Sequence, residues 1–382
     1  MDSIYLDNAS TTFPKPPAVP AAVVDYMTNS GVNVSRGSYA AAYAAQERLL
    51  EVRQNLCELF NGPDCRNVIF TKNVTESLNL LLRGFVRPGD HILVSAMEHN
   101  AVMRPLVEMG AEFTRIPCNA QGELCTERME ECLRPNTRAV IMTHASNVCG
   151  TVMPLAEVGA FCRAHNLKFF ADCAQSAGVL DIDMQTMHLD AVAFTGHKGL
   201  MGPQGTGGLV MTRELSDELP PFLAGGTGSA SDSERMPAFL PDKFEPGTPN
   251  LPGLMGLGAG VDFVRSVTPA AVLAHELTLT AQFLDGLKEL ERRGLVRILG
   301  RRDTVNRTGV VSIQTPRRDE AETAAALEER HGILTRVGLH CAPNAHKTLG
   351  SFPHGSIRFS FGWYNTPADV SRALEALEAE CG

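Results

Sequence analysis

The sequence lacks any run that approaches the roughly 20 consecutive apolar residues of a membrane-spanning helix. Residues 1–7 contain neither the basic start nor the apolar stretch of a secretory signal. We therefore expect a cytoplasmic protein that binds no membrane. With a formal net charge of −9, the chain also lacks the basic excess of most nucleic-acid-binding proteins, so we expect no nucleic-acid partner.

None of the ten cysteines forms a C-x-x-C pair. Cys118, Cys125 and Cys132 are regularly spaced, but their spacing is not one that common metal sites use, so we predict no metal site. In a reducing compartment most of these side chains are expected to be buried free thiols, which pack as small hydrophobic groups.

The chain has 382 residues, more than one hydrophobic core usually organises, so two domains are expected. Apolar residues make up 44% and charged residues 20%, a balance typical of a folded protein rather than a disordered one. Neither an internal repeat nor a low-complexity tract is present.

Short apolar runs alternate with helical patterns in the first two thirds of the chain. Such alternation indicates βαβ units and a mostly parallel sheet flanked by helices, an α/β fold. Seven strands are predicted: Val68–Thr71, His91–Ser95, Glu112–Ile116, Ala139–Thr143, Lys168–Ala171, Ala191–Thr195 and Gly208–Met211. Ligands bind beyond the carboxyl ends of the strands in these sheets, so the residues after each strand are the candidates for a site.

The last third of the chain predicts a different unit. Pro220–Gly260 is rich in Gly, Pro and Ser, and we interpret it as a long functional or interface loop. A long helix then runs from about Pro269 to Arg293, followed by short apolar segments, a strand at Ser356–Phe361 and a final helix at Pro367–Glu380. This pattern is typical of a smaller α+β domain.

Two residues after neighbouring strands suit pyridoxal 5'-phosphate (PLP) chemistry. Asp172 ends one strand, and Lys198 follows the next in Gly196-His197-Lys198. A carboxylate can keep the pyridine nitrogen of PLP protonated, and a lysine can form the imine with its aldehyde. The alternative is a surface lysine and a helix-capping aspartate.

Three further positions after strands fit the same hypothesis. Thr75 and Glu76 open a helix, whose N-terminus can bind phosphate, although capping explains them equally well. His99 can stack on a cofactor ring or be a solvated loop residue. Asn147 can bond a ring hydroxyl or a substrate carboxylate, or be a turn residue.

Together these motifs resemble one family. The sequence is similar to the class V aminotransferase superfamily of PLP fold type I, and within it to cysteine desulfurases and selenocysteine lyases. The resemblance extends from Tyr5 to about Asn365. It is carried by Tyr5–Thr12, Glu98-His99-Asn100, Asp172-Cys173-Ala174-Gln175 and Thr195-Gly196-His197-Lys198.

The resemblance implies a role for each matching residue. Lys198 would be the Schiff-base lysine and the proton shuttle, Asp172 the partner of the pyridine nitrogen, and Gln175 a contact of the ring hydroxyl. His99 would stack on the ring and take part in catalysis. Thr75, Thr195 and His197 would bind the phosphate of PLP, together with a threonine from a partner subunit, which matches Thr248. Glu76, beside Thr75, is also expected to be cofactor-binding. This implies a homodimer with its active sites at the interface.

The implied substrate residues lie mainly near the C-terminus. Arg358 matches the arginine that clamps the substrate α-carboxylate, a task that suits a planar guanidinium. Asn147 matches a second substrate contact. The implied architecture is an N-terminal segment of residues 1–15 packing near the site, a large PLP-binding domain of residues 16–255, and a small domain of residues 256–382 that carries Cys341 and Arg358.

Cys341 resembles the sulfur-accepting cysteine of desulfurases with a short catalytic loop. It lies in Gly338-Leu339-His340-Cys341-Ala342-Pro343. Attack on sulfur requires a thiolate, which His340 and nearby positive groups could favour. The alternative is an incidental thiol.

These residues predict a PLP-dependent cysteine desulfurase, a sulfurtransferase that converts L-cysteine to L-alanine. The sulfur would pass to Cys341 as a persulfide and then to an acceptor protein or small thiol. L-selenocysteine is an alternative substrate, and another C–S lyase or an aminotransferase is an alternative activity, because only the persulfide route requires Cys341. A non-catalytic PLP-fold protein is a further alternative. One departure from the pattern, at Arg36-Gly37-Ser38-Tyr39, leaves the substrate open.

Overall fold

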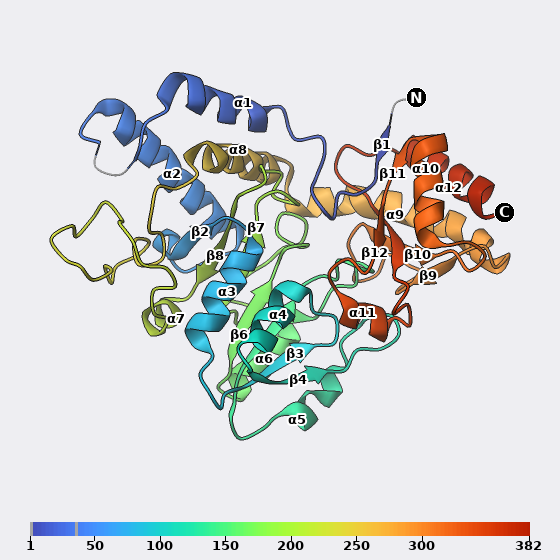
Figure 1. The fold of residues 1–382 in the computed structure, drawn as a ribbon, viewed down its shortest axis with the longest axis horizontal. Helices are drawn as coiled ribbons and strands as arrows, with labels where there is room; N and C mark the ends of the chain where they lie inside the picture. Colours follow the sequence, from blue (N-terminus) through green and yellow to red (C-terminus); the bar gives the residue numbers. More distant parts are fainter. Residues whose placement is uncertain (1–2, 35–36) are drawn as a thin grey trace.

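The computed structural model describes residues 3–34 and 37–382 (Figure 1). Arg36, part of the departing segment, lies outside the described residues. A seven-stranded sheet occupies one half of the molecule, in the order β2-β8-β7-β6-β5-β3-β4. Its strands are β2 (Val68–Thr71), β3 (His91–Ser95), β4 (Glu112–Ile116), β5 (Thr137–Thr143), β6 (Lys168–Asp172), β7 (Ala191–Thr195) and β8 (Gly207–Met211).

The sheet is mostly parallel, as the sequence predicts. Only β8 runs antiparallel to its neighbours, β2 and β7. The central strands are buried on both sides, so their sequences are nearly continuous apolar runs. This arrangement confirms the predicted α/β fold class and brings the carboxyl ends of β3, β5, β6 and β7 to one edge.

Helices cover both faces of this sheet. The hydrophobic core on one face includes side chains of α2 (Ala40–Leu59), α6 (Leu155–Ala164) and α8 (Leu251–Val267). The core on the other face includes side chains of α3 (Val74–Phe85), α4 (Asn100–Glu108) and α7 (Arg213–Glu218). Between these layers, side chains alternate along each strand, as in Val68 against Ile69. Short α5 (Met129–Cys132) and η3 (Thr126–Arg128) follow β4.

A second unit contains the C-terminal part of the chain. Its antiparallel sheet has the order β12-β13-β10-β9. The strands are β9 (Arg297–Leu299), β10 (Val310–Gln314), β12 (Arg336–Gly338) and β13 (Ser356–Ser360), and the helices are α9 (Pro269–Arg292), α10 (Glu320–His331), α11 (Pro343–Thr348) and α12 (Pro367–Cys381). Ile4 and Leu6 join this hydrophobic core, and β1 (Ile4–Tyr5) pairs with β11 (Ile333–Leu334).

The prediction of a loop up to Gly260 is wrong, because α8 begins at Leu251. Its many glycines lower helix propensity, which hides the helix in the sequence. Here they allow close packing instead. A Cβ on Gly258 would lie 2.6 Å from Cγ2 of Val52 in α2, and a Cβ on Gly260 would lie 2.4 Å from the carbonyl oxygen of Leu200. The glycines therefore press α8 against α2 and against the turn that follows Lys198.

The predicted boundary between residues 255 and 256 falls within α8 and stays a prediction. The N-terminal helical segment, α1 (Ala18–Asp25) and η1 (Tyr26–Ser30), packs on α8. Among the described residues, no single helix has the length and apolar character needed to cross a membrane, although α8 and α9 together meet that composition across a bend of 78°.

Candidate active site

Asp172 and Lys198 lie at the carboxyl edge of the large sheet. Asp172 is the last residue of β6, and Lys198 follows β7, the adjacent parallel strand. The two side chains interact electrostatically, because the charge of Asp172 raises the pKa of Lys198. The edge therefore brings together the carboxylate and the amine that the sequence predicts for PLP.

Burial lowers the pKa of Lys198 to about 8, and the charge of Arg358 adds to this effect. A larger fraction of this amine is consequently neutral near pH 7 than of an ordinary lysine. A neutral amine is the form that attacks a carbonyl carbon and removes a proton. The neutral form that both predicted tasks require is thus more accessible at Lys198 than at an ordinary lysine.

Asp172 is buried, and burial raises its pKa. One of its carboxylate oxygens, Oδ1, accepts a hydrogen bond of 3.0 Å from the N–H of Ala174. A buried carboxylate is costly unless a cation or further donors satisfy it. A protonated pyridine nitrogen is a partner of the required charge.

His99 caps the N-terminus of α4, where its Nδ1 accepts a hydrogen bond of 3.0 Å from Ala101. Burial lowers the pKa of His99 to about 4, with the charges of Lys198 and Arg104 contributing. The ring is therefore neutral, with its proton on Nε2, and provides an uncharged aromatic face. This is consistent with the predicted stacking role.

Glu98, which directly precedes His99, was not predicted as a site residue. Its buried carboxylate accepts hydrogen bonds from the hydroxyl of Ser95 at the end of β3 and from the N–H of Thr143 at the end of β5, at 3.0 Å. Burial raises the pKa of Glu98 to about 8, and the nearby Asp172 contributes. Glu98 thereby links the end of β3 to the end of β5, next to His99.

The residues predicted to bind the phosphate of PLP lie where α3 meets β7 and β8. Gly207 pairs with Thr195, and a Cβ on Gly207 would lie 2.7 Å from Cα of Asn73, so only glycine lets the N-terminus of α3 come this close. Thr195 is buried, and Thr75 is exposed on the first turn of α3. His197 adds a buried ring nitrogen, Nδ1, without a hydrogen-bond partner among the described residues.

Glu76 is placed less directly for binding phosphate. Its N–H donates to Oδ1 of Asn73 at 3.0 Å, and its carboxylate accepts from the N–H of Lys72 at 2.6 Å. These bonds cap the helix, which was the alternative interpretation. Thr248 lies on an exposed loop and lines a cavity of about 300 Å³ together with Lys72 and Glu76 of its own chain.

The N-terminal segment holds the turn that carries Lys198. The hydroxyls of Thr11 and Thr12 and the ammonium of Lys15 all donate to the carbonyl oxygen of His197, at 3.1, 3.3 and 2.7 Å. Nearby, the side-chain amide of Gln175 donates to the carbonyl oxygen of Ala9 at 3.0 Å. Gln175 therefore also contacts this segment, which the sequence did not reveal.

Arg358 reaches the site from β13 and is buried. Its Nη2 donates to Oδ1 of Asp7 and to Oγ of Ser10, each at 2.7 Å. Its Nη1 donates to the carbonyl oxygen of Asn147 at 3.1 Å, and its Nε has no partner among the described residues. Arg358 is consequently held by Asp7, Ser10 and Asn147, and its Nε–H stays unsatisfied.

Cys341 is the only exposed cysteine in the described part of the chain. Its backbone lies in the left-handed region, with φ of 56°, directly after His340 with φ of 48°. Two such residues in succession are each strained by about 1 kcal/mol or more, so other contacts must hold them. The Cys341 carbonyl oxygen accepts a 2.8 Å hydrogen bond from Asn100 in α4, beside His99, and Nδ2 of Asn147 donates to the carbonyl oxygen of His340 at 2.7 Å.

The expectation that His340 supplies charge to Cys341 is wrong. His340 is buried and its Nε2 contacts the hydroxyl of Ser356 at 3.0 Å. Burial lowers the pKa of His340 to about 2, and the charge of Arg358 adds to the effect. The imidazole is therefore neutral near pH 7 and supplies no positive charge to Cys341.

Asp7 and Ser10 are site residues that were not predicted from the sequence, although both lie in the N-terminal motif Tyr5–Thr12. They contact Arg358 across 351 and 348 residues of sequence. A motif marks such residues but does not say what they touch, because the contact depends on the path of the whole chain.

The described residues fit PLP. Buried polar groups at this edge suit a bound polar molecule: Nδ1 of His197 and Nε of Arg358 have no hydrogen-bond partner among the described residues, and the carboxylate of Asp172 is buried. Lys198 would hold the cofactor, Asp172 its pyridine nitrogen and His99 its ring. The described residues contain no group of three or more His, Cys, Asp or Glu side chains placed to hold a metal ion.

A sheet edge with this lysine, aspartate and histidine is the site of a PLP-dependent enzyme. The chain belongs to the aminotransferase class-V family, whose model matches residues 4–373. A protein of Methanothermobacter thermautotrophicus described as a probable cysteine desulfurase is 32% identical, with 100% of this chain and 95% of the relative covered. The cysteine desulfurase of Haloferax volcanii is 32% identical, with 98% of this chain and 89% of the relative covered.

Solved structures agree with this membership. The apo structure of a cysteine desulfurase from Thermococcus onnurineus has a TM-score of 0.91 at 31% identity, covering 99% of this chain and 94% of that one. A cysteine desulfurase from Escherichia coli has a TM-score of 0.87 at 29% identity, covering 99% and 94%. The resemblance stated from the sequence and the predicted fold class are both confirmed.

Proposed function

We propose that this protein is a PLP-dependent cysteine desulfurase that converts L-cysteine to L-alanine and takes the sulfur onto Cys341. The observation that carries the proposal is the position of Cys341, which is exposed yet fixed against the N-terminus of α4, beside His99. The relatives named as cysteine desulfurases support it. An aminotransferase or a lyase that releases free sulfide needs no thiol at this position.

The residues divide the reaction between them. Bound PLP would act as an electron sink for the charge left at the substrate Cα. Lys198, with its lowered pKa, removes the proton from Cα and returns it. Asp172 would keep the pyridine nitrogen of bound PLP protonated, and Arg358 would bind the substrate α-carboxylate.

Sulfur transfer then takes place at Cys341. Its thiolate attacks the substrate sulfur, so that an S–S bond forms while the Cβ–S bond breaks. The electron pair of the broken bond stays with the substrate carbon, which takes up a proton and becomes the methyl group of alanine. Cys341 is left as a persulfide, whose exposure suits removal by an acceptor protein or a small thiol.

The test is Cys341→Ala with Cys125→Ala as a matched control. We expect Cys341→Ala to keep the visible absorbance of bound PLP but to lose alanine formation from L-cysteine, because proton removal survives and sulfur has no acceptor. Mass spectrometry of the wild-type peptide should show the added sulfur on Cys341. Full activity of Cys341→Ala, or an unmodified peptide after turnover, would refute the proposal. Parallel assays with L-selenocysteine decide between the two substrates.

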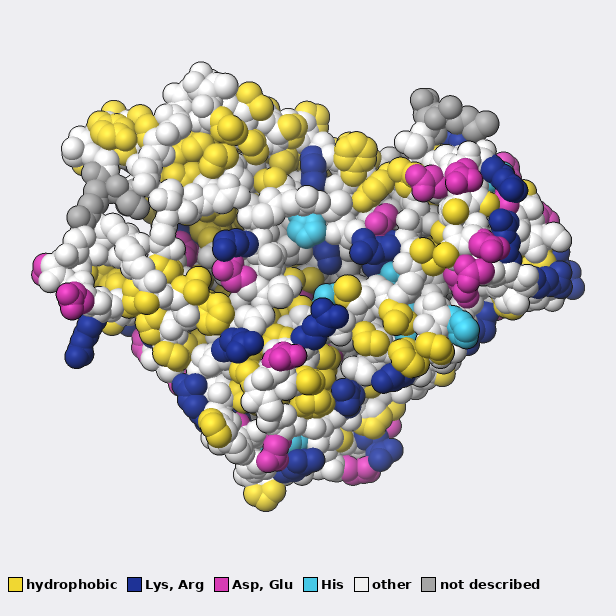
Figure 2. Space-filling model, in the orientation of Figure 1, with side chains coloured by type: hydrophobic (Ala, Val, Ile, Leu, Met, Phe, Trp, Pro, Cys, Tyr) yellow, Lys and Arg dark blue, Asp and Glu magenta, His cyan; other side chains and the backbone are white. Residues whose placement is uncertain are grey.

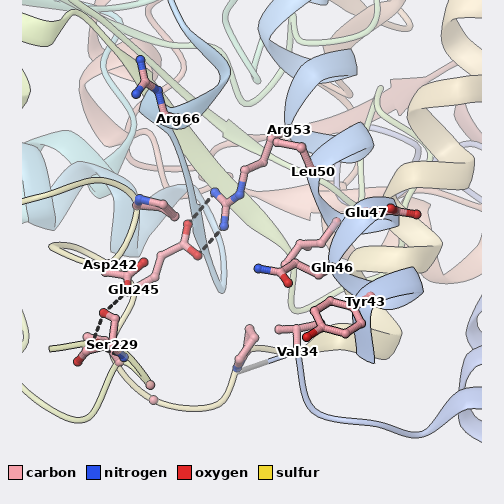
Figure 3. A pocket seen from close by; sticks show the side chains of 16 residues that line it. Val34, Tyr43, Gln46, Glu47, Leu50, Arg53, Arg66, Ser229, Asp242 and Glu245 are labelled. Carbon is pink, nitrogen blue, oxygen red and sulfur yellow. Dashed lines mark hydrogen bonds and ion pairs between the residues drawn. The ribbon is translucent and has the colours of Figure 1, made fainter. Parts of the chain in front are cut away.

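We also propose a homodimer in which Thr248 serves the partner's site. Thr248 lies on the long segment before α8, which a bidentate ion pair of Arg53 with Glu245, at 2.8 and 2.6 Å, holds to α2 (Figure 3). Large apolar side chains are exposed on both: Tyr43 and Leu50 on α2, and Leu223 and Phe239 on the segment. Such exposure favours a covering partner. We expect light scattering to give twice the 41.2 kDa mass of one chain; a monomer that retains PLP would contradict this.

A further inference from the structure

Fewer N–H groups of Arg358 are free to bind a carboxylate than an unengaged guanidinium would offer. A guanidinium binds a carboxylate through two parallel N–H groups, on one of two faces: Nε with Nη2, or Nη1 with Nη2. Both faces use Nη2. In this structure Nη2 already donates to Asp7 and to Ser10, each at 2.7 Å. A bidentate grip on any other carboxylate therefore competes with Asp7 and Ser10 for Nη2.

Asp7 and Ser10 form one unit with Arg358. The Ser10 hydroxyl donates to Oδ1 of Asp7 at 2.7 Å, so the three groups close a triangle. The side chain of Arg358 is 3% exposed and that of Asp7 is 16% exposed. Because this ion pair is well shielded from water, solvent does not readily separate the two side chains. Some other group must stabilise Asp7 when Arg358 turns to a substrate.

Arg336 is that group. It lies on β12, which pairs with β13 so that Arg336 is directly opposite Arg358. Its Nη1 donates to Oγ of Ser10 at 2.9 Å and lies 3.8 Å from Oδ2 of Asp7. Oδ2 is the carboxylate oxygen that Arg358 does not use. The side chain of Arg336 is 49% exposed, so it has freedom to move closer.

We propose that Asp7 is a carboxylate gate: it occupies Nη2 of Arg358 until the substrate α-carboxylate arrives, and Arg336 then retains Asp7. The gate rests on the proposed role of Arg358 in substrate binding. Two arginines and one aspartate leave the cluster with a positive charge that an incoming carboxylate neutralises. A ligand without a carboxylate does not displace Asp7, so the gate also selects for amino acids over simple amines.

The test measures binding, with L-alanine and its carboxylate-free counterpart ethylamine titrated into the PLP-loaded enzyme and followed by cofactor absorbance. Asp7→Asn removes the competitor's charge and should tighten L-alanine binding about three- to tenfold. Arg336→Met leaves Asp7 without its second partner and should weaken L-alanine binding by a similar factor, whereas Arg336→Lys and the distant, exposed Arg317→Met should change little. Ethylamine binding should respond to none of them.

The double variant Asp7→Asn/Arg336→Met distinguishes the gate from a direct electrostatic attraction between Arg336 and the ligand carboxylate. If Arg336 acts only by holding Asp7, its replacement has no effect once Asp7 is neutral, so the double variant should bind L-alanine as Asp7→Asn does. An undiminished effect of Arg336→Met in that background would overturn the gate, as would weaker binding by Asp7→Asn, which a purely structural role predicts. If Asp7→Asn does not fold, Ser10→Ala removes one of the two acceptors that compete for Nη2 and should tighten binding about twofold; weaker binding there would equally overturn the gate.

These outcomes are independent of the desulfurase reaction. Absence of alanine from L-cysteine, with the expected binding pattern, would reject the proposed function and leave the gate. The reverse result would reject the gate alone.

Discussion

Lys198 and Arg358 serve one site but are supported in opposite ways. Lys198 follows a central strand, and three side chains of the N-terminal segment donate to the carbonyl oxygen just before it. Those bonds use backbone acceptors that no substrate competes for. Arg358 is held by Asp7 and Ser10 through side-chain bonds to the nitrogen that a carboxylate would use. Figure 2 shows basic and histidine side chains gathered where the two parts of the molecule meet.

The difference separates a fixed part from an exchangeable part. We call Asp172, Lys198 and their strand ends the lysine side, and Arg358, Asn147 and Cys341 the arginine side. Chemistry at Cα requires a base that does not move, which the sheet provides. Binding, sulfur transfer and release require contacts that can be exchanged. The N-terminal segment joins both sides, because residues 7–15 bond to each.

The largest effect is expected on the lysine side. Lys198→Ala should lower alanine formation by about 10²- to 10⁴-fold, the usual contribution of a positioned acid–base group, and should also abolish the covalent attachment of PLP. Lys288→Ala, at an exposed lysine on α9, is the matched control. Binding of carboxylate ligands near Arg358 should persist in Lys198→Ala. If carboxylate binding were lost together with activity, the two sides would not be separable.

The sequence predicts the lysine side well. Asp172, Thr195 and Lys198 follow apolar strand patterns, and parallel strands necessarily end at one edge, so local patterns suffice. It predicts the arginine side only as a set of motifs. Its contacts link residues 7 and 10 to residue 358, and no periodicity encodes such a pairing.

Two other predictions from the sequence were wrong, and each error has a physical cause. The glycines of α8 indicate a loop by propensity, yet they serve close packing against Val52 and Leu200. His340 was expected to supply positive charge, but burial of its ring lowers its pKa and keeps it neutral. In both cases the tertiary environment, which the sequence does not display, reverses the local expectation.

A smaller effect should separate Cys341 from substrate binding. Asn147→Ala removes the bond to the His340 carbonyl oxygen but leaves the Asn147 backbone oxygen for Arg358. Loss of one hydrogen bond, about 1 kcal/mol, should slow persulfide formation on Cys341 about fivefold and increase amide hydrogen exchange around residue 341. L-alanine binding should be unchanged, with exposed Asn29→Ala as the control. If L-alanine bound more weakly, Asn147 would be a substrate contact, as the family resemblance implies.

The smallest effect is a shift in pH dependence that links the two sides. Only the neutral amine of Lys198 attacks PLP, so the rate at which apoenzyme attaches PLP should rise with pH. The midpoint of this rise should lie near the lowered pKa of about 8, rather than near the ordinary value of 10.5. Asp172 stabilises the ammonium form, so Asp172→Asn should move the midpoint to lower pH. Arg358 disfavours the ammonium form, so Arg358→Met should move it to higher pH, whereas distant Arg317→Met should not. Stopped-flow absorbance across the pH range measures the midpoint. A shift with Asp172→Asn but none with Arg358→Met would mean that the charge of Arg358 does not reach Lys198, and the two sides would then be coupled only through residues 7–15.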